Sequence, residues 1–552
     1  SDNIITVCGK GGFPINLAEK ASNDMNMQNG NKDEKFCVMT KVFDGCSEKE
    51  NTEKYDLPDY LPDVNKLLRV DARLVGMNRY VNGDTLEYDG SILYSVLYAT
   101  AQGEMRSASF ESTISGSMPV SGYEDGCLLD FDAAAENVTC RLQGPRKLTA
   151  KAKIRICAAI YCEKCTEPAF AGKLTPEERA NMQYLYESIE GETQESFEVR
   201  GNSVSEDIEI PSGMPPVSEI ISVDTDTYVY EMRPSENGLS YKGDVIANIL
   251  YSYKKPAENE EEAAENGGML YASLVRKIPI YGDIPAETDE PPVFCLGRAE
   301  ITKLEYRPQE NSLGESRIIE IDFDYDIFAD CYYNEESNVV KDIYSLDYEN
   351  GNEYSSLSFR NVAKAQTFNF SVNSTEQNSD AEFSTAVSTV ASASIESVTK
   401  DSGKLIFEGK AEVSVILTNG DGLFMGKNYT VPLRAEADAG KTADNFTYAV
   451  TSAVIFAASR ADSEKIATDL EIAIAYVTFN EYETLAVTQS TVYKDKPVYA
   501  PEHSAVVIYY PAKDEKLWGI AKKYNTTEDA IRRANGISGD YATGNMIVVP
   551  KK

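Results

Sequence analysis

The chain has 552 residues and a formal net charge of −36, with 89 acidic side chains against 53 Lys and Arg. This charge disfavours binding to nucleic acid or anionic lipid, because both repel a negative surface. The single histidine, His503, excludes catalytic or zinc sites that need several histidines. A chain of this length is expected to fold as several domains.

Residues 1–33 are predicted to form an N-terminal arm. The start of the arm, Ser1 to Cys8, lacks a basic region followed by an apolar core, so the sequence predicts no secretory leader. No later stretch approaches the roughly 18 uninterrupted apolar residues of a membrane-spanning helix. Both observations favour synthesis in the cytoplasm.

All ten cysteines lie between Cys8 and Cys331, whereas an oxidised scaffold would be stapled more evenly along its length. The C-x-x-C pair Cys162 and Cys165 has no second pair at zinc-ribbon spacing, which favours a disulfide or two free thiols over a metal site. Candidates for cross-links between neighbouring subunits are Cys8, Cys37 and Cys46.

An internal repeat follows the arm. Residues 62–98 align without a gap with residues 215–251, so that Leu67–Asp71 matches Ile220–Asp224. A third copy is recognisable at residues 405–417. The body of the chain is therefore predicted to consist of three diverged copies of one unit.

In each copy, β-branched and aromatic residues alternate with polar ones, the pattern of antiparallel strands. Residues 86–98 are predicted to form one long strand with a bend or bulge at Gly90. The predicted fold of the body is a series of antiparallel β-sandwich-like units at residues 34–168, 194–335 and 352–480.

Three other segments separate these units and the tail. The capping box Thr175-Pro176-Glu177-Glu178 predicts a helix running towards Ile189, so residues 169–193 are expected to be a helical connector. The acidic stretch Glu258–Gly268 is expected to be a solvated hairpin loop. Residues 481–504 are expected to be a linker.

Two predicted strands carry like charges on one face, because charged and apolar residues alternate along them. Like charges in a row repel one another unless they are hydrated or matched. One interpretation is two solvent-facing surfaces. The other is a contact between the basic face of one subunit and the acidic face of the next, which would propagate into a filament or lattice. The basic face comprises Lys151, Lys153 and Arg155, and the acidic face Glu320, Asp322, Asp324 and Asp326.

Residues 505–552 differ from the body and predict a βααβ module. Two strands, at 506–510 and 546–550, enclose two helices, with a cap at Asp514 for the first and capping-box spacing of Thr526 and Asp529 for the second. The predicted fold class of the chain is thus mainly β, with a small C-terminal βααβ domain. Unlike the acidic body, this tail has more Lys and Arg than Asp and Glu, so it would dock on an acidic surface of its own chain or of a partner.

The tail resembles a LysM domain through Leu517-Trp518-Gly519-Ile520-Ala521, Ala534-Asn535-Gly536 and Ile547–Pro550. This resemblance implies binding to N-acetylglucosamine polymers. The Gly-Asp-Thr of the usual groove loop is here Asp514-Glu515-Lys516, which removes the close backbone approach that glycine permits. Trp518 is either a core residue or a sugar platform. The candidates for groove or docking contacts are Asp514, Glu515, Lys516, Trp518, Asn535, Gly536 and Ile537.

The repeated units resemble SPOCS domains of spore-coat morphogenetic proteins, through Leu61–Val64, Leu67–Asp71, Asp89-Gly90 and Leu93–Tyr98. The resemblance implies a non-enzymatic scaffold that is made in the mother-cell cytoplasm and deposited on the forespore or spore surface. It implies other spore-coat proteins and further copies of the chain as partners, in an oligomer or polymer, and the tail as a docking module. No cofactor and no metal are expected.

Two other functions stay open. The protein could be an adaptor of the cell wall or cortex that binds peptidoglycan through its LysM tail. It could also be a carbohydrate hydrolase that acts with two carboxylates, although the sequence identifies no catalytic pair.

Overall fold

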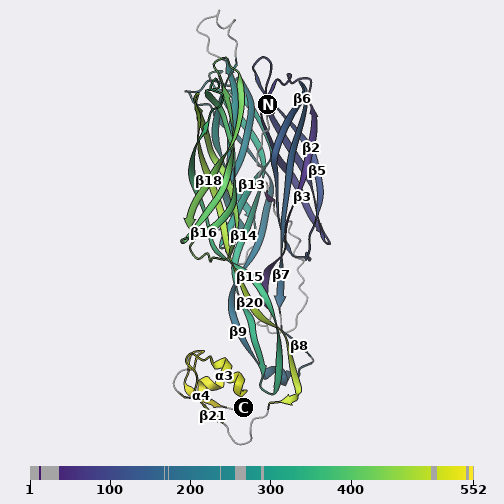
Figure 1. Cartoon of the computed structure of the whole chain (residues 1–552), viewed down its shortest axis with the longest axis vertical. Coiled ribbons are helices and arrows are strands. Elements are labelled where there is room, and N and C mark those ends of the chain that lie inside the picture. Colours follow the sequence, from purple (N-terminus) through teal and green to yellow (C-terminus); the bar gives the residue numbers. More distant parts are fainter. Residues whose placement is uncertain are drawn as a thin grey trace, which may run out of the picture.

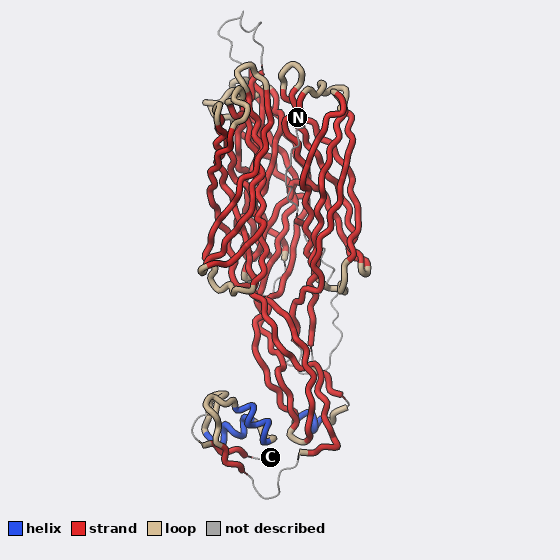
Figure 2. Tube along the Cα trace, viewed as in Figure 1, coloured by secondary structure: helices blue, strands red, loops and turns tan. Residues whose placement is uncertain are grey.

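Alternating apolar and polar residues produce long antiparallel strands throughout the computed structural model (Figure 1). The structure describes residues 12–13, 36–166, 168–171, 173–236, 238–254, 269–286, 291–498, 506–542 and 546–550. Three β units form a head, the longest strands leave it as a stalk, and the helical module lies at the far end of the stalk (Figure 2). The predicted fold class, mainly antiparallel β with a small C-terminal βααβ domain, is confirmed.

Each unit has six long strands. Three consecutive strands form a meander, and in the second sheet the sixth strand lies between the fifth and the first. The third copy has the same topology as the other two. The strands of unit 1 are β2 (Phe36–Asp56), β3 (Lys66–Asn82), β4 (Thr85–Ala99), β5 (Met105–Pro119), β6 (Leu128–Gly144) and β7 (Lys147–Thr166). Those of unit 2 are β9 (Met182–Glu209), β10 (Glu219–Ser235), β11 (Gly238–Lys254), β12 (Met269–Pro285), β13 (Phe294–Glu310) and β14 (Ser316–Ser345). Those of unit 3 are β15 (Tyr348–Gln377), β16 (Thr385–Asp401), β17 (Lys404–Thr418), β18 (Phe424–Asp438), β19 (Phe446–Ala461) and β20 (Lys465–Pro497).

Two short strands extend these sheets. From the N-terminal arm, β1 (Gly12–Phe13) pairs antiparallel with β6 of the same chain. Between units 1 and 2, β8 (Ala169–Ala171) pairs parallel with β20. Both ends of unit 1 are therefore tied to sheets by backbone hydrogen bonds.

Each unit encloses a core between its two sheets. Along β14, Ile319, Ile321, Phe323 and Tyr325 are at most 2% exposed, while the acidic residues between them point outward. Each such side chain contributes about 1.5–3 kcal/mol when it leaves water. The period of two in the sequence therefore specifies which face of each strand is inside.

A glycine occupies the same place in the central strand of each meander, at Gly90, Gly243 and Gly409. Each lies opposite a β-bulge in the first meander strand. A Cβ atom at Gly243 would lie 2.6 Å from the carbonyl oxygen of Tyr228, so the bulged strand leaves room for glycine alone. The irregularity predicted at Gly90 is therefore a bulge in the neighbouring strand β3, and β4 itself runs through without a break.

The three meanders meet in a shared apolar cluster. It contains Leu68 and Leu97 from unit 1, Ile221 and Leu250 from unit 2, and Ile416 and Phe424 from unit 3. Next to this cluster Arg69 forms an ion pair with Asp224. These two residues belong to the aligned segments 67–71 and 220–224, so the repeated motif of unit 1 contacts its own counterpart in unit 2.

The stalk corrects two predictions. The helix α1 (Pro176–Ala180) has the predicted capping box of Thr175 and Glu178 but stops after five residues, and β9 begins at Met182. The helical connector over 169–193 is therefore wrong beyond this turn, because residues 182–193 pair with β14. The linker over 481–504 is also wrong in its first part, since β20 continues to Pro497 and pairs with β15. The predicted acidic loop at 258–268 lies outside the described residues.

Unit 1 contains three disulfides, which join Cys37 to Cys165, Cys46 to Cys157 and Cys127 to Cys162. The first two connect directly opposite residues of β2 and β7. The prediction that Cys37 and Cys46 cross-link neighbouring subunits is therefore wrong, because both sulfurs are bonded within the chain. Cys8 lies outside the described residues.

Candidate functional site

The C-terminal module consists of β21 (Val506–Tyr509), α3 (Leu517–Tyr524), α4 (Glu528–Asn535) and β22 (Ile547–Pro550). The two strands pair antiparallel, and both helices pack on one face of the pair. Leu517, Ile520, Ile531 and Val549 are completely buried between them. The βααβ order predicted from the sequence is confirmed.

The helix caps of the module differ from the predicted ones. Asp514 lies in a turn with a positive φ, and the N-cap of α3 is Lys516, which makes no side-chain capping bond. The N-cap of α4 is Thr527, whose hydroxyl accepts from the Ala530 N–H, so the start shifts by one residue from Thr526. The N–H of Thr526 instead donates to the carbonyl of Ala521 and closes the turn between the helices.

Several of the predicted groove residues have structural partners. Asn535 donates to the carbonyls of Ile531 and Val548 and accepts from the Val548 N–H at 2.7 Å, which fastens α4 to β22. Gly536 has the left-handed conformation that ends α4, and Ile537 belongs to the core. Glu515 accepts from the Tyr509 hydroxyl at 2.9 Å. Asp514 and Lys516 are exposed.

The module rests on the end of the stalk through a contact that we call the seat, formed by Asp342 and Tyr344 of β14. The Trp518 indole N–H donates to Asp342 at 2.9 Å, and the Lys522 ammonium lies 2.7 Å from the same carboxylate. The Tyr344 hydroxyl donates to the Thr526 carbonyl at 2.6 Å, and its ring packs edge-on against Trp518. Only 8% of Trp518 is exposed. The structure therefore places this side chain between the module and its own stalk.

Comparison with known families assigns both kinds of domain. A family model for the LysM domain matches residues 512–550, and one described as "SipL, SPOCS domain" matches residues 63–143, which include β3, β4, β5 and nearly all of β6. The chain therefore contains a SPOCS domain and a LysM domain. No curated protein and no solved structure matches it. The SPOCS and LysM domains fit a spore-related protein that is capable of binding peptidoglycan. Among the described residues, no helix has the length and apolar composition to cross a membrane.

The seat gives a prediction about the LysM module. Replacing Asp342 with alanine removes the charged acceptor of Trp518 and Lys522, which we expect to weaken the seat by about 2 kcal/mol. Because Trp518 is the one tryptophan of the chain, its fluorescence reports on the seat directly. We expect the emission of D342A to shift to longer wavelength. The control Asp469→Ala, on the exposed surface of β20, should leave the spectrum unchanged, and an unshifted D342A spectrum would contradict the seat.

Sequence reasoning missed Asp342 and Tyr344. They lie on β14, far along the chain from the helices that they contact, and the surrounding residues show only the alternation of a strand. The only available signal was the contrast between a basic tail and an acidic body, which predicted docking without naming the acidic partner.

The predicted assembly faces have partners within their own sheets. Lys151 and Lys153 of β7 lie 2.8 and 2.6 Å from Glu50 and Glu48 of β2, and Arg155 pairs with Glu136 of β6. On β14, Glu320 and Asp322 pair with Arg307, while Asp324 accepts from Ser203 and Asp326 from the Gly201 N–H. Neighbouring strands thus match the like charges. A contact between copies through these faces stays a prediction.

A buried ion pair joins all three units, and we call it the three-unit joint. Arg360 of unit 3 donates two hydrogen bonds to Glu192 of unit 2, at 2.6 and 3.2 Å, and one to the Tyr161 hydroxyl of unit 1. Its guanidinium also lies 4.1 Å from the ring centre of Phe479. The side chain of Glu192 is 1% exposed. Burial opposes the charge of Arg360, but Glu192 and Tyr161 outweigh it and raise the pKa of Arg360.

Two acidic groups between units 1 and 2 are held against their preferred charge. Burial raises the pKa of Asp71 to about 6, and the nearby Asp224 adds to this effect. Burial likewise raises the pKa of Glu300 to about 7, and the like charge of Asp326 adds to this effect. The contact between the two units therefore favours protonated carboxyls.

This arrangement predicts that stability falls as the pH rises from about 4 to about 7. In the unfolded chain these carboxyls have pKa values of about 4, so they release protons before the folded chain does. Asp71 alone should contribute about 3 kcal/mol to this loss. Denaturant unfolding at each pH should show the slope, and D71N and E300Q should flatten it.

Asp462 provides a control with the opposite sign. The backbone N–H groups of Glu464 and Lys465 lower the pKa of Asp462. Its contribution to the stability of the fold is therefore lost as the pH falls. D462N should therefore leave the slope between pH 5 and 7 in place. If the double variant D71N/E300Q still loses stability between pH 4 and pH 7, Asp71 and Glu300 are not the cause of that loss.

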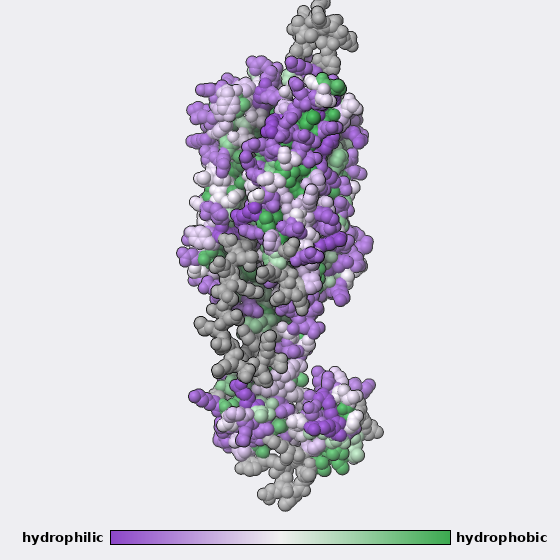
Figure 3. Space-filling view, turned by 180° about the vertical axis from the view of Figure 1, so that it is seen from behind, coloured by the Kyte–Doolittle hydropathy of each residue, from purple (hydrophilic) through white to green (hydrophobic). Residues whose placement is uncertain are grey.

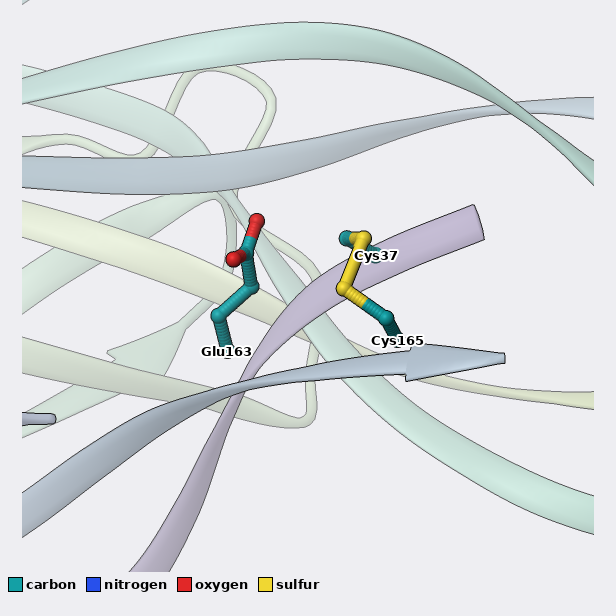
Figure 4. A group of neighbouring side chains, drawn as sticks. All are labelled: Cys37, Glu163 and Cys165. Atoms are coloured by element: carbon teal, nitrogen blue, oxygen red, sulfur yellow. A yellow bond between two sulfur atoms is a disulfide. The ribbon is translucent and has the colours of Figure 1, made fainter. Parts of the chain in front are cut away.

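One cluster among the described residues has the ligand types of a metal site, namely Cys37, Glu163 and Cys165. Figure 4 shows Glu163 beside the disulfide that joins the two cysteines. Sulfurs bonded to each other are not thiolate ligands, which leaves a single exposed carboxylate. This cluster therefore gives no reason to place a metal here.

Proposed function

We propose that this protein is a non-enzymatic scaffold of the endospore coat or spore surface, which assembles through protein–protein contacts and docks through its LysM module. In this proposal it is made in the mother cell and deposited on the forespore. The observation that carries the proposal is the seat. Asp342 and Tyr344 hold the module in one orientation at the end of a long β stalk, an arrangement suited to presenting a docking surface.

The exposed side of the module supports docking to a protein. Val506, Ile508 and Tyr510 alternate along the outer face of β21 and are 51%, 59% and 70% exposed, with Met546 beside the neighbouring strand. Figure 3 shows hydrophobic residues gathered at the lower end of the module. Exposed apolar patches of this kind mark interaction sites. The partner in this proposal is another spore-coat protein or a further copy of the chain.

Electron microscopy of the purified protein tests the assembly. We expect fibres or sheets for the wild type and single rods for I508D, because a charge in the patch opposes its burial. The matched control is L423D, since Leu423 is 54% exposed on the head, away from the module. Single rods for the wild type at every concentration, with and without extracted coat proteins, would contradict the proposal.

Binding to peptidoglycan is the second candidate function, and the match to the LysM family favours it. The exposed loop residues Asp514 and Lys516 would then contact the glycan. Sedimentation with purified peptidoglycan separates the two functions. Co-sedimentation that is lost in K516E but kept in I508D would support an adaptor, and a wild type that does not co-sediment with peptidoglycan would support docking to protein.

A further inference from the structure

Unit 2 contains two cysteines at directly opposite positions of neighbouring antiparallel strands. Cys295 of β13 and Cys331 of β14 are partners in the register of the sheet. Both side chains are buried, at 7% and 0% exposure, and both sulfurs are free. Cys295 is also the strongest influence on the pKa of the Cys331 thiol, which it raises. The two thiols thus face each other across the sheet without being bonded.

The disulfides of unit 1 show that this fold accepts a bond at such positions. Cys37 and Cys165 are also opposite each other in an antiparallel pair, and their Cα atoms are 4.0 Å apart. Cys127 and Cys162 join β6 to β7, the two strands that correspond to β13 and β14, with a Cα separation of 4.3 Å. The cysteine pair of unit 2 therefore lies on the hairpin that is already bridged in unit 1.

The alignment of the two hairpins places the pair in the geometry that a disulfide needs. Arg146 and Arg317 mark equivalent points, because each donates to carbonyls in the loop between the first and second strands of its unit. Counted from these arginines, Cys331 corresponds to Ile160, whose partner across the sheet is Leu129. The pair Leu129 and Ile160 lies two residues from the Cys127–Cys162 disulfide on the same inward face. Since opposite pairs of an antiparallel ladder alternate between two types, positions two residues apart have the same spacing.

We propose that Cys295 and Cys331 form a fourth disulfide when the chain folds in the presence of a low-molecular-weight disulfide oxidant. Cys295 is the less buried of the two side chains, so it is the sulfur that the oxidant meets first. Its thiolate attacks one oxidant sulfur and releases one thiol, leaving a mixed disulfide. The Cys331 thiolate then attacks the Cys295 sulfur and releases the second. Both cysteines are oxidised, the oxidant is reduced to two thiols, and the two protons of the cysteine thiols end on those products.

This disulfide is expected to form while the chain folds and not after unit 2 is complete. The neighbouring Cys295 and burial raise the pKa of Cys331, which keeps its thiol protonated and slow to react once it is enclosed. The adjacent residues Leu296 and Tyr332 pack against Phe479 of unit 3. The bond therefore fixes β13 to β14 where unit 2 supports unit 3, a part of the molecule that the three disulfides of unit 1 do not reach.

Peptide mapping of the full chain tests this proposal. The chain is refolded with oxidised glutathione, denatured without a reductant, alkylated with iodoacetamide and digested. We expect a linked peptide pair containing Cys295 and Cys331, lighter by two hydrogen atoms than the two free peptides together. Cys140 is the internal control, because it is buried like them but lies opposite Ala150, and it should be alkylated in every sample.

Two outcomes would overturn the proposal. One is full alkylation of Cys295 and Cys331 while the unit 1 disulfides remain linked, and the other is a link from either residue to a different cysteine. The variant C295A adds a second measurement. It should make Cys331 fully alkylated, and addition of reductant should lower the thermal stability of the wild type further than that of the variant. An equal loss of thermal stability in the wild type and in C295A would also overturn the proposal.

Discussion

Replacing Arg360 with methionine is expected to lower the free energy of unfolding by about 3–5 kcal/mol, because it leaves Glu192 buried without a partner. Methionine fills much of the same space, so the loss reports on the charge rather than on a cavity. The carboxylate of Glu192 is 1% exposed and receives both of its strongest hydrogen bonds from Arg360. Removal of the guanidinium thus removes the one cation that compensates its burial.

Denaturant unfolding followed by circular dichroism measures this effect, with the first transition taken as the reporter because a chain of several units need not unfold in one step. The matched control is R434M. Arg434 pairs with Glu408 at the surface, and their side chains are 57% and 51% exposed, so its loss should cost less than about 1 kcal/mol. Combining R360M with E192L should recover much of the stability, because the unpaired charge is then gone. Equal losses in R360M and R434M would show that the joint is not a buried ion pair.

Removing the two nested disulfides of unit 1 is also expected to lower the free energy of unfolding strongly. Cys46–Cys157 lies inside the loop closed by Cys37–Cys165, and the paired cysteines are 111 and 128 residues apart. While one bond remains, removing the other frees only residues 37–46 and 157–165 in the unfolded chain. This should lower the free energy of unfolding by about 3 kcal/mol. Removing both frees the whole loop and should cost about 8 kcal/mol in total. Unit 1 should then unfold before the rest of the chain.

The comparison requires three variants, C46A/C157A, C37A/C165A and the combination of all four changes. Unfolding in denaturant should give similar midpoints for the first two and a much lower midpoint for the third. The control is C127A/C162A, which removes the third bond, between cysteines 35 residues apart, and leaves the nested pair intact. If the fourfold variant loses only the sum of the two small effects, the bonds do not act through one shared loop.

The sequence predicted the repeated units well because a constant spacing and a period of two survive divergence. Gly243 and Gly409 keep their place since the bulge opposite them leaves no room for a side chain, and that requirement is local. The βααβ tail was predictable for the same reason, as its strands and helices follow one another closely. Its exact caps were not, because Thr526 and Thr527 are both suitable residues and only the packed turn distinguishes them.

Pairings between distant strands could not be predicted. The capping box at Thr175 indicated a helix correctly, but nothing near it showed that Met182 already pairs with Ser345 across the stalk. The same limit applies to charge. Lys151 appeared unmatched in the sequence because its partner, Glu50, lies on a strand about a hundred residues earlier, and the register that brings them together is a property of the folded sheet.

The three-unit joint has a consequence for the order in which the molecule is completed. Domains generally fold from the N-terminus as they leave the ribosome. Tyr161 and Glu192 emerge well before Arg360, so a growing chain that contains only units 1 and 2 holds an acidic group with no cation to accompany it into the interior. Glu192 is expected to stay in water until unit 3 arrives. Nascent chains that stop short of Arg360 would thus remain open at this point, so the joint closes only after synthesis has reached unit 3.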